Sequence, residues 1–251
     1  MTATLTQLIP ERREIDAQQA YGGLELADLA PSDRPYVVAN MVSSADGSAV
    51  LSGRSAGVSN DLDRELFHVL RTQTDAIMAG TATMAIEHYG PLVPESERRK
   101  RRESLGLAAT PIALTATRTM NLPVKAPLFQ DPSSRVIVLT CCEDDVPDCA
   151  ASVTAVRTPG KTIDFDAAMR RLRAEQSIRS ILLEGGPTLL GSMVAAGVVD
   201  ELFLTLSPLV AGGEAGTTIV EGAPLPGPVA LGLQSAYLAR DSLFLRYALR
   251  S

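Results

Sequence analysis

Two segments of the sequence combine glycines with polar side chains where a buried strand is expected to end. In the first, residues 182–190, an apolar run leads into Glu184, Gly185 and Gly186, and Pro187 begins a predicted helix. Proline suits that position because its missing N–H would have no partner within the helix. Glycines let a phosphate approach the backbone closely, and the N-terminus of a helix attracts anions. The segment therefore predicts a phosphate site, although a strand-to-helix turn without a ligand has the same pattern.

The second segment, residues 75–84, has the same design. A short apolar run is followed by Gly80, and Thr81 and Thr83 add hydroxyl groups at the start of a predicted helix. A glycine turn with threonine capping is the simpler interpretation. Neither segment matches the G-x-G-x-x-G pattern typical of dinucleotide-binding folds. A dinucleotide nevertheless presents a pyrophosphate and two riboses, so two such turns in one sheet favour a dinucleotide more than either turn does.

Three acidic or hydroxyl side chains are candidates for the substrate end of such a site. Asp46 lies in an Asp-Gly turn after a predicted strand, where it could orient or protonate a heterocycle. Its alternative is an ordinary turn aspartate. Ser59 and Asp63 lie at the start of a predicted helix and could bind a ribose or a nicotinamide amide. The alternative is that Ser59 or Asn60 is a plain helix cap and Asp63 a favourable first-turn charge.

A further group of residues could hold the adenosine end of a cofactor. Thr115 and Arg118 follow another predicted strand, and Thr140 ends the next one. A guanidinium can form paired hydrogen bonds with a phosphate, so Arg118 suits the 2′-phosphate that distinguishes NADPH from NADH. A surface arginine without a ligand is the alternative.

The elements that must position these residues follow an α/β pattern, with short apolar runs alternating with helical periodicity from Tyr36 onward. Strands are predicted at 36–43, 75–79, 111–115, 135–140, 153–157 and 179–183, and helices at 60–72, 81–87, 95–105, 143–151, 164–176 and 187–197. After Gly197, residues 199–207, 229–239 and 242–249 are predicted strands without helices between them. The sequence thus predicts a mostly parallel central sheet with an antiparallel C-terminal hairpin.

Composition and charge narrow the function classes. The net charge of -6 disfavours general nucleic-acid binding, which needs a basic surface. Three cysteines and two histidines without paired spacing predict free thiols and no metal site. We find neither a membrane-spanning run nor a secretory signal, so no membrane partner and a cytoplasmic location are expected. Residues 1–34 are polar and predicted to form an N-terminal arm, and residues 35–251 a single domain.

Taken together, the segments resemble the riboflavin-biosynthesis pyrimidine reductases, over roughly residues 35–249. The most specific pieces are Ser-Ala-Asp-Gly, Asp-Ala-Ile-Met-Ala-Gly-Thr and Glu-Gly-Gly-Pro-Thr-Leu. The resemblance implies a three-layer fold like that of dihydrofolate reductase, a homodimer, and the NADPH-dependent reduction of the ribosyl chain of an aminopyrimidine phosphate to a ribityl chain. Hydride would pass to the sugar C1′ through an open-chain imine.

The resemblance also implies roles for individual residues. Asp46 and Asn40 would face the substrate, with Asp46 acting as an acid, and Glu184 would lie beside the nicotinamide as a second catalytic residue. The residues expected to contact the cofactor are Ser59, Asp63, Gly80, Thr81, Gly185, Gly186, Thr188 and Leu189, to which the pattern adds Thr83, Thr115, Arg118, Thr140 and Pro187.

Departures from the family keep other functions open. Many bacterial members are fused to a zinc deaminase, but this sequence has neither a His-x-Glu nor a Pro-Cys-x-x-Cys pattern, so we expect no deamination by that chemistry. The loop 87–92 has no arginine where bacterial members usually have one, which weakens the case for a phosphorylated ribosyl substrate. A dihydrofolate or pterin reductase of the same fold is the second hypothesis, and a non-catalytic NADPH-binding module is the third.

Overall fold

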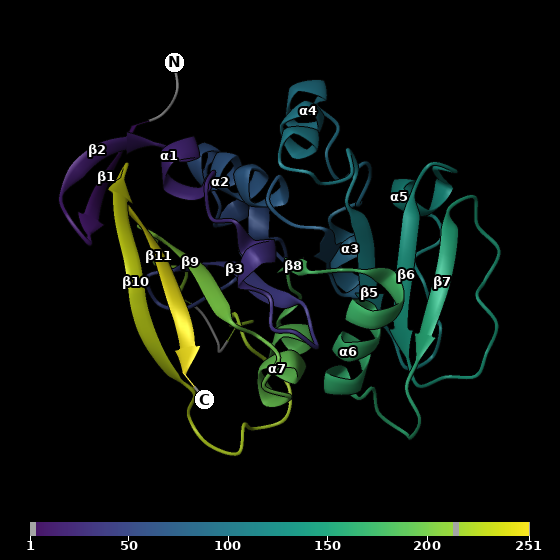
Figure 1. Cartoon of the computed structure of the whole chain (residues 1–251). Helices are drawn as coiled ribbons and strands as arrows, with labels where there is room; N and C mark the ends of the chain where they lie inside the picture. Colours follow the sequence, from purple (N-terminus) through teal and green to yellow (C-terminus); the bar gives the residue numbers. More distant parts are fainter. Residues whose placement is uncertain (1–3, 213–215, 251) are drawn as a thin grey trace.

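A computed structural model describes residues 4–212 and 216–250 and contains one eleven-stranded sheet (Figure 1). The strands are β1 (Thr4–Ile9), β2 (Arg13–Asp16), β3 (Tyr36–Ser44), β4 (Ala76–Met78), β5 (Ile112–Ala116), β6 (Arg135–Thr140), β7 (Ser152–Arg157), β8 (Ser180–Leu183), β9 (Glu201–Ser207), β10 (Ala230–Ala239) and β11 (Ser242–Arg250). The helices are α1 (Ala17–Tyr21), α2 (Asp61–Arg71), α3 (Thr81–Ile86), α4 (Ser96–Ser104), α5 (Pro127–Gln130), α6 (Phe165–Gln176) and α7 (Pro187–Ala195).

The strand order is β2-β1-β10-β11-β9-β3-β8-β4-β5-β6-β7. In this spatial order, the neighbouring strands β9, β3, β8, β4, β5, β6 and β7 are parallel to one another. Strands β11, β10, β1 and β2 extend the sheet from β9 in antiparallel fashion. The predicted mostly parallel sheet with an antiparallel C-terminal hairpin is therefore confirmed. Because β8 returns between β3 and β4, the carboxyl ends of these strands meet at a crevice, where open α/β sheets bind ligands.

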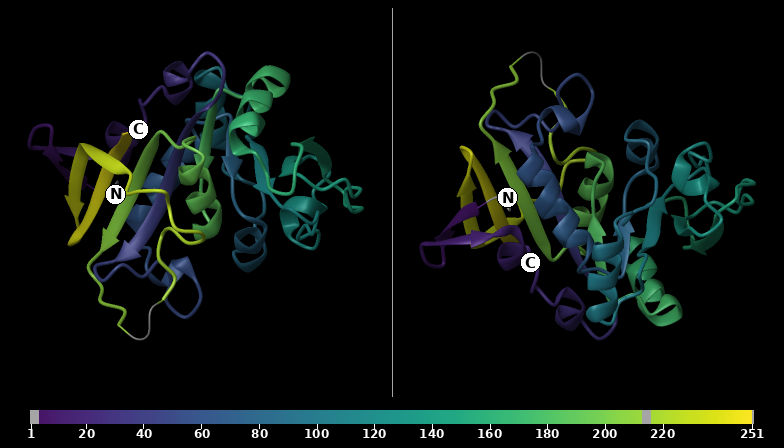
Figure 2. Two further views of the ribbon diagram at one scale, coloured as in Figure 1. Left: turned by 90° about the horizontal axis from the view of Figure 1, so that it is seen from below. Right: turned by 90° about the horizontal axis from the view of Figure 1, so that it is seen from above.

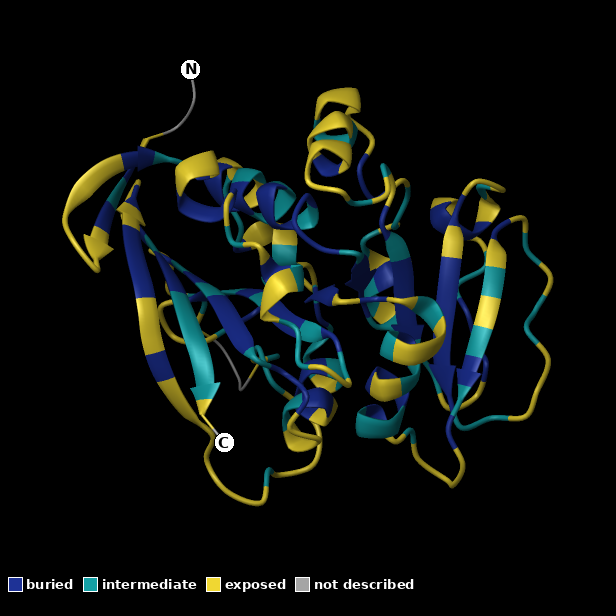
Figure 3. Ribbon diagram, in the orientation of Figure 1, coloured by how far each residue is buried: buried dark blue, intermediate teal, exposed yellow. Residues whose placement is uncertain are grey.

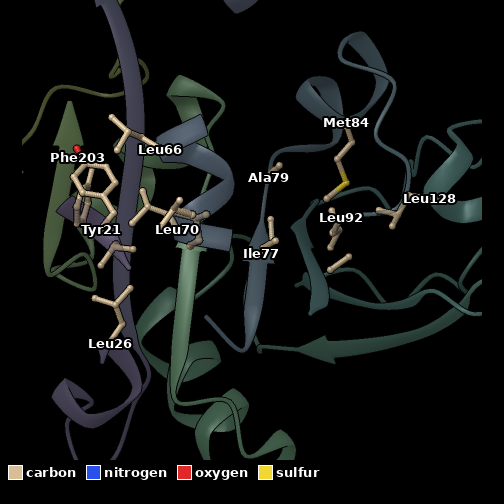
Figure 4. Close-up of a cluster of buried hydrophobic side chains, with 14 of the residues drawn as sticks. Tyr21, Leu26, Leu66, Leu70, Ile77, Ala79, Met84, Leu92, Leu128 and Phe203 are labelled. Atoms are coloured by element: carbon tan, nitrogen blue, oxygen red, sulfur yellow. The ribbon is translucent and has the colours of Figure 1, made fainter. Parts of the chain in front are cut away.

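Two hydrophobic cores, one on each face of the sheet, make the fold a three-layer sandwich (Figures 2 and 3). Helices α1 and α2 cover one face, and α6 and α7 cover the other. The apolar residues of α2 recur with helical spacing and are buried, as predicted for residues 60–72. Figure 4 shows Leu66 and Leu70 of this helix beside Tyr21 and Phe203, whose rings meet edge to face at 5.0 Å.

The N-terminal segment differs from the irregular arm that its composition suggests. Strand β1 pairs with β10 and β2 pairs with β1, so the segment completes one edge of the sheet. Leu5 and Tyr21 are buried in the core that α2 covers. Only alternate residues of β1 face that core, and the strand is six residues long. Such a short half-buried strand carries little hydrophobic signal, and its pairing partner lies more than two hundred residues away in sequence.

The helix predicted for residues 143–151 is wrong. These residues form an irregular connection between β6 and β7. Pro147 lies in the middle of the segment, where its ring and missing N–H are incompatible with a helix interior. Cys142, Val146 and Cys149 pack against the core from this irregular segment. All three cysteines of the chain are free thiols.

Among the described residues, no helix has both the length and the apolar character needed to cross a bilayer. In the same residues, His, Cys, Asp and Glu side chains form no group of three or more that could hold a metal ion. Within the basic run of α4, Arg98 pairs with Glu65 and Glu95, and Lys100 pairs with Glu97.

Candidate functional site

A cavity of about 1360 Å³ lies at the carboxyl end of the parallel strands. Its walls come from β3, from the segments that follow β4, β5 and β8, and from α2, α3 and α7. Most residues singled out in the sequence line it: Asn40, Ser59, Asp63, Gly80, Thr81, Thr83, Arg118, Glu184, Gly185, Gly186, Pro187, Thr188 and Leu189. The sheet topology therefore brings together segments that are up to about 150 residues apart in the chain.

The two glycine turns touch each other in this cavity. The Gly80 N–H donates to the Gly185 carbonyl at 2.8 Å. A Cβ atom on Gly186 would lie 2.9 Å from Thr83 Oγ1, and Gly185 has a φ of +95°, which L side chains rarely adopt. No side chain caps the N-terminus of α7, which begins at Pro187 in the cavity wall. Its first N–H groups are thus available to an anion.

Helix α2 presents polar groups to the cavity from one side. Asp63, Phe67 and Arg71 are spaced four residues apart and all line it. The helix cap is Asn60, whose Oδ1 accepts the N–H groups of Leu62 and Asp63 at 3.0 and 2.9 Å. Of the two residues predicted as possible caps, Asn60 therefore caps the helix, and Asp63 lies in the first helical turn.

Asp63 is a buried carboxyl group that forms no salt bridge with any residue the structure describes. Its side chain accepts hydrogen bonds from the hydroxyls of Ser59 and Thr205, both at 2.6 Å. The residue is only 7 % exposed, and burial raises the pKa of its carboxyl group. The hydrogen bonds from the two hydroxyls oppose that shift without cancelling it. Asp63 is therefore a cavity-lining acid that retains its proton to higher pH than an exposed aspartate.

Glu184 has a different environment, although it also lines the cavity. Arg71 Nε and Nη2 donate to its two carboxylate oxygens, each at 2.7 Å, and the Tyr89 hydroxyl donates to Oε2 at 2.5 Å. The side chains of Glu184 and Arg71 are 1 % and 12 % exposed. Burial raises the pKa of Tyr89 well above its usual range, so this hydroxyl remains a donor. The arrangement anchors the Glu-Gly-Gly turn to α2.

Sequence reasoning missed Arg71, Tyr89 and Phe67. The guanidinium of Arg71 lies 4.4 Å from the centroid of the Phe67 ring, and a further hydrogen bond joins its Nη1 to the Leu92 carbonyl at 2.9 Å. Helical spacing from Asp63 could have identified Phe67 and Arg71, since both follow it at whole turns of α2. The role of Tyr89 depends on tertiary contact alone, because its partner Glu184 is 95 residues away.

The structure does not bring Asp46, Thr115 or Thr140 into the cavity lining. Thr115 and Thr140 are buried, and the Thr140 hydroxyl accepts the Cys142 N–H at 3.0 Å. Thr117, next to Arg118, lines the cavity in their place. Asp46 is exposed, and hydrogen bonds from the Ser44 hydroxyl and from backbone N–H groups lower its pKa to about 2. An acid of that strength is ionised near neutral pH and is unsuited to donating a proton.

Comparison with known proteins shows the family of this chain. Residues 35–241 match the model of the RibD C-terminal domain. The chain belongs to the RibD C-terminal domain family. It is 25% identical over 224 residues to a 2,5-diamino-6-ribosylamino-4(3H)-pyrimidinone 5′-phosphate reductase of Methanothermobacter thermautotrophicus, covering 86% of this chain and 99% of that protein. A protein of the same description from Archaeoglobus fulgidus is 24% identical over 192 residues, covering 75% of this chain and 87% of the relative.

Solved structures of RibD-type reductases share the fold. A pyrimidine reductase-like protein of Corynebacterium diphtheriae superposes with a TM-score of 0.77 and 25% identity, covering 94% of this chain and 98% of that one. The riboflavin biosynthesis reductase of Saccharomyces cerevisiae gives a TM-score of 0.72 at 18% identity, covering 94% of this chain and 100% of that one. The expected fold, like that of dihydrofolate reductase, is confirmed by these neighbours.

The contact between the glycine turns leads to a first prediction. Gly186→Ala places a Cβ against Thr83 Oγ1 and should weaken binding of the nicotinamide cofactor by about tenfold or more, because the Thr83 side chain or the turn itself must shift. Fluorescence titration with the reduced cofactor measures this. The double variant Gly186→Ala/Thr83→Ala removes the clashing hydroxyl and should recover part of the affinity. Gly227→Ala, where an added Cβ meets nothing within 4 Å, is the matched control. Equal affinities of Gly186→Ala and Gly227→Ala would contradict the prediction.

Proposed function

We propose that this chain is an NADPH-dependent reductase that converts a ribosylaminopyrimidine phosphate to its ribityl form in riboflavin biosynthesis. One observation carries the proposal. The buried acid Asp63 lines the same cavity as the two joined glycine turns, so a proton source and a set of phosphate-binding groups share one enclosure. The names of the archaeal relatives support the choice of substrate.

The residues of the cavity fit a dinucleotide with a 2′-phosphate. A Cβ atom would crowd the turn at Gly186, and Thr81 and Thr83 add hydroxyl groups beside it. Arg118 is exposed, lines the cavity and forms no hydrogen bond or salt bridge with the residues that the structure describes. When bound, NADPH supplies the hydride for the reduction.

Arg118 is the residue expected to select NADPH over NADH. Arg118→Ala should raise the Kd for NADPH by about tenfold or more while changing the Kd for NADH by less than about twofold, because a single charge-assisted phosphate contact is lost. Titration with each cofactor gives both constants. Arg12→Ala, which removes an exposed arginine of the β1–β2 turn, is the control and should change neither constant. A parallel loss of affinity for both cofactors would exclude this role for Arg118.

The sheet order supports our proposal for the side of the cavity that receives the substrate. The glycine turns follow β8 and β4, whereas Asp63 is hydrogen-bonded to Thr205 of β9, which lies on the far side of β3. Asp63 and Asn40 of β3 therefore lie on the side of the cavity away from the phosphate-binding turns. Reduction of a C=N bond consumes a hydride and a proton. We assign the proton to Asp63, in place of the Asp46 indicated by the sequence, because burial raises the pKa of Asp63 and the cavity wall includes it.

A second candidate function draws on the arginines of the cavity. Arg71 is engaged by Glu184, and Arg64 pairs with Asp61, so among the described residues these two arginines are not free to bind a sugar phosphate. The ring of a pterin carries no phosphate and presents amino and ring N–H groups that a carboxylate can bind. This observation keeps a dihydrofolate or pterin reductase as the alternative.

One assay separates the candidates. Oxidation of NADPH is followed by its absorbance while purified protein is given the diaminopyrimidinone and aminouracil ribosyl phosphates, and dihydrofolate in parallel. Turnover of a ribosyl phosphate is expected and identifies which ring the enzyme accepts. Turnover of dihydrofolate alone would replace the proposal with the second candidate. NADPH binding without any turnover would leave a non-catalytic binding module.

We also propose that the protein is a cytoplasmic homodimer. Its three cysteines are free thiols, as is usual in a reducing compartment. Strand β10 exposes Leu231, Leu233 and Leu238 to 42 %, 42 % and 39 %, and an apolar face of this kind is typical of a subunit interface.

The exposed face of β10 gives a direct test of the homodimer. Leu233→Glu should halve the molar mass measured by light scattering during size-exclusion chromatography, because a charge at the interface would be desolvated. Leu105→Glu, at a leucine exposed to 38 % beyond α4, should leave the mass unchanged. A wild-type mass equal to that of one chain would contradict the homodimer.

A further inference from the structure

Two chain segments that are distant in sequence form one wall of the cavity together. The first is the turn after β3, residues 44–50, and the second is the segment after β9, of which residues 207–212 and 216–217 are described. The Ala45 N–H donates to the Leu209 carbonyl and the Ala49 N–H to the Thr217 carbonyl, both at 2.8 Å. Ala49 and Thr217 both line the cavity, so the position of this wall depends on how the two segments are joined.

Asp46 joins the same two segments through its side chain. One carboxylate oxygen accepts the Ala211 N–H at 3.0 Å, and the other accepts the Gly212 N–H at 2.7 Å. The Ser44 hydroxyl donates to the carboxylate as well and fixes its orientation. Among the hydrogen bonds between the described parts of the two segments, those of Asp46 are the ones made by a side chain. Hydrogen bonds from N–H groups to a carboxylate are roughly twice as strong as those between neutral groups.

We propose that Asp46 is a positioning residue that clamps the segment after β9 to the turn after β3 and thereby shapes the wall that receives the substrate. The low pKa of Asp46 agrees with this role, because the clamp needs an ionised carboxylate at neutral pH. The identity of the substrate rests on the function proposed above, whereas the clamp itself does not depend on it.

The test compares Asp46→Ala with Asp46→Asn. Asparagine keeps one oxygen acceptor and should retain part of the clamp, while alanine removes it. Asp131→Ala is the matched control, because the half-buried Asp131 also accepts an N–H and a hydroxyl, both from Ser133, and it does not line the cavity. Hydrogen exchange at the Ala211 and Gly212 amides reports the clamp without any need for activity, and the circular dichroism spectrum confirms that each variant is folded.

In Asp46→Ala, exchange at these two amides should accelerate by about tenfold, and by less in Asp46→Asn. The KM for the pyrimidine substrate should rise by about tenfold in Asp46→Ala while kcat falls by less than about threefold. Unchanged exchange at both amides would overturn the clamp. A collapse of kcat at constant KM, equal in the two variants, would instead restore Asp46 as a proton donor. If the wild-type protein turns over no substrate, the proposed function fails and the exchange measurement still decides the clamp.

Discussion

Asp63→Asn should lower kcat/KM for the pyrimidine substrate by about 10²-fold to 10⁴-fold, the usual contribution of a general acid. The carboxyl group lies in the cavity wall, and burial raises its pKa, so a fraction of it keeps a proton where an exposed aspartate would not. Wild-type kcat/KM should fall as the pH rises through this raised pKa, because the protonated form is the active one. This alkaline decline should be absent in Asp63→Asn. Steady-state assays across pH measure both effects.

Asp63→Asn should also stabilise the fold at neutral pH. A carboxyl group whose pKa is raised by folding favours the unfolded state once the pH exceeds its unfolded value of about 4, because the unfolded chain ionises first. The Tm of the variant should therefore exceed that of the wild-type protein at pH 7, and the difference should shrink below about pH 4. Asp61→Asn is the control, since Asp61 is exposed in the same helical turn. Full activity in Asp63→Asn would contradict the assignment of the proton to Asp63.

Glu184→Gln should destabilise the protein by about 3–5 kcal/mol, because it leaves the buried guanidinium of Arg71 without its counter-ion. Arg71→Met should have a similar effect by stranding the carboxylate. The double variant Arg71→Met/Glu184→Met leaves no unpaired charge and should be more stable than the sum of the single effects predicts. Urea unfolding gives the free energies, and an unchanged m-value shows that the comparison is valid.

The exposed pair formed by Arg171 and Glu175 is the control for this result. Its atoms are 2.7 Å apart, as in the buried pair, but the side chains are 40 % and 45 % exposed. Glu175→Gln should change the free energy of unfolding by less than about 1 kcal/mol, because water solvates both charges. If Glu184→Gln and Glu175→Gln had equal effects, burial would not determine the strength of the first pair.

Much of the fold could be predicted because its signals are local. The buried strands are short apolar runs, and the apolar stripe of α2 follows helical spacing within eleven residues. Both glycine turns were found for the same reason, since a strand end, a glycine and a helix start are contiguous in the chain. The reason why residues 143–151 do not form the predicted helix is also local, because Pro147 in the middle of the segment is incompatible with a helix interior.

The sequence by itself determined which segments we propose to carry chemistry, namely the two glycine turns, Asp63 near the start of α2, and Arg118. Only the tertiary structure decided the surroundings of each acid. Asp46 is exposed and accepts several hydrogen bonds, Glu184 is paired with an arginine 113 residues away, and Asp63 is buried and forms no salt bridge within the described part of the chain. The proton affinity of a carboxyl group depends on its solvation and on the charges around it. Those surroundings come from strands that are distant in the chain and adjacent in the sheet.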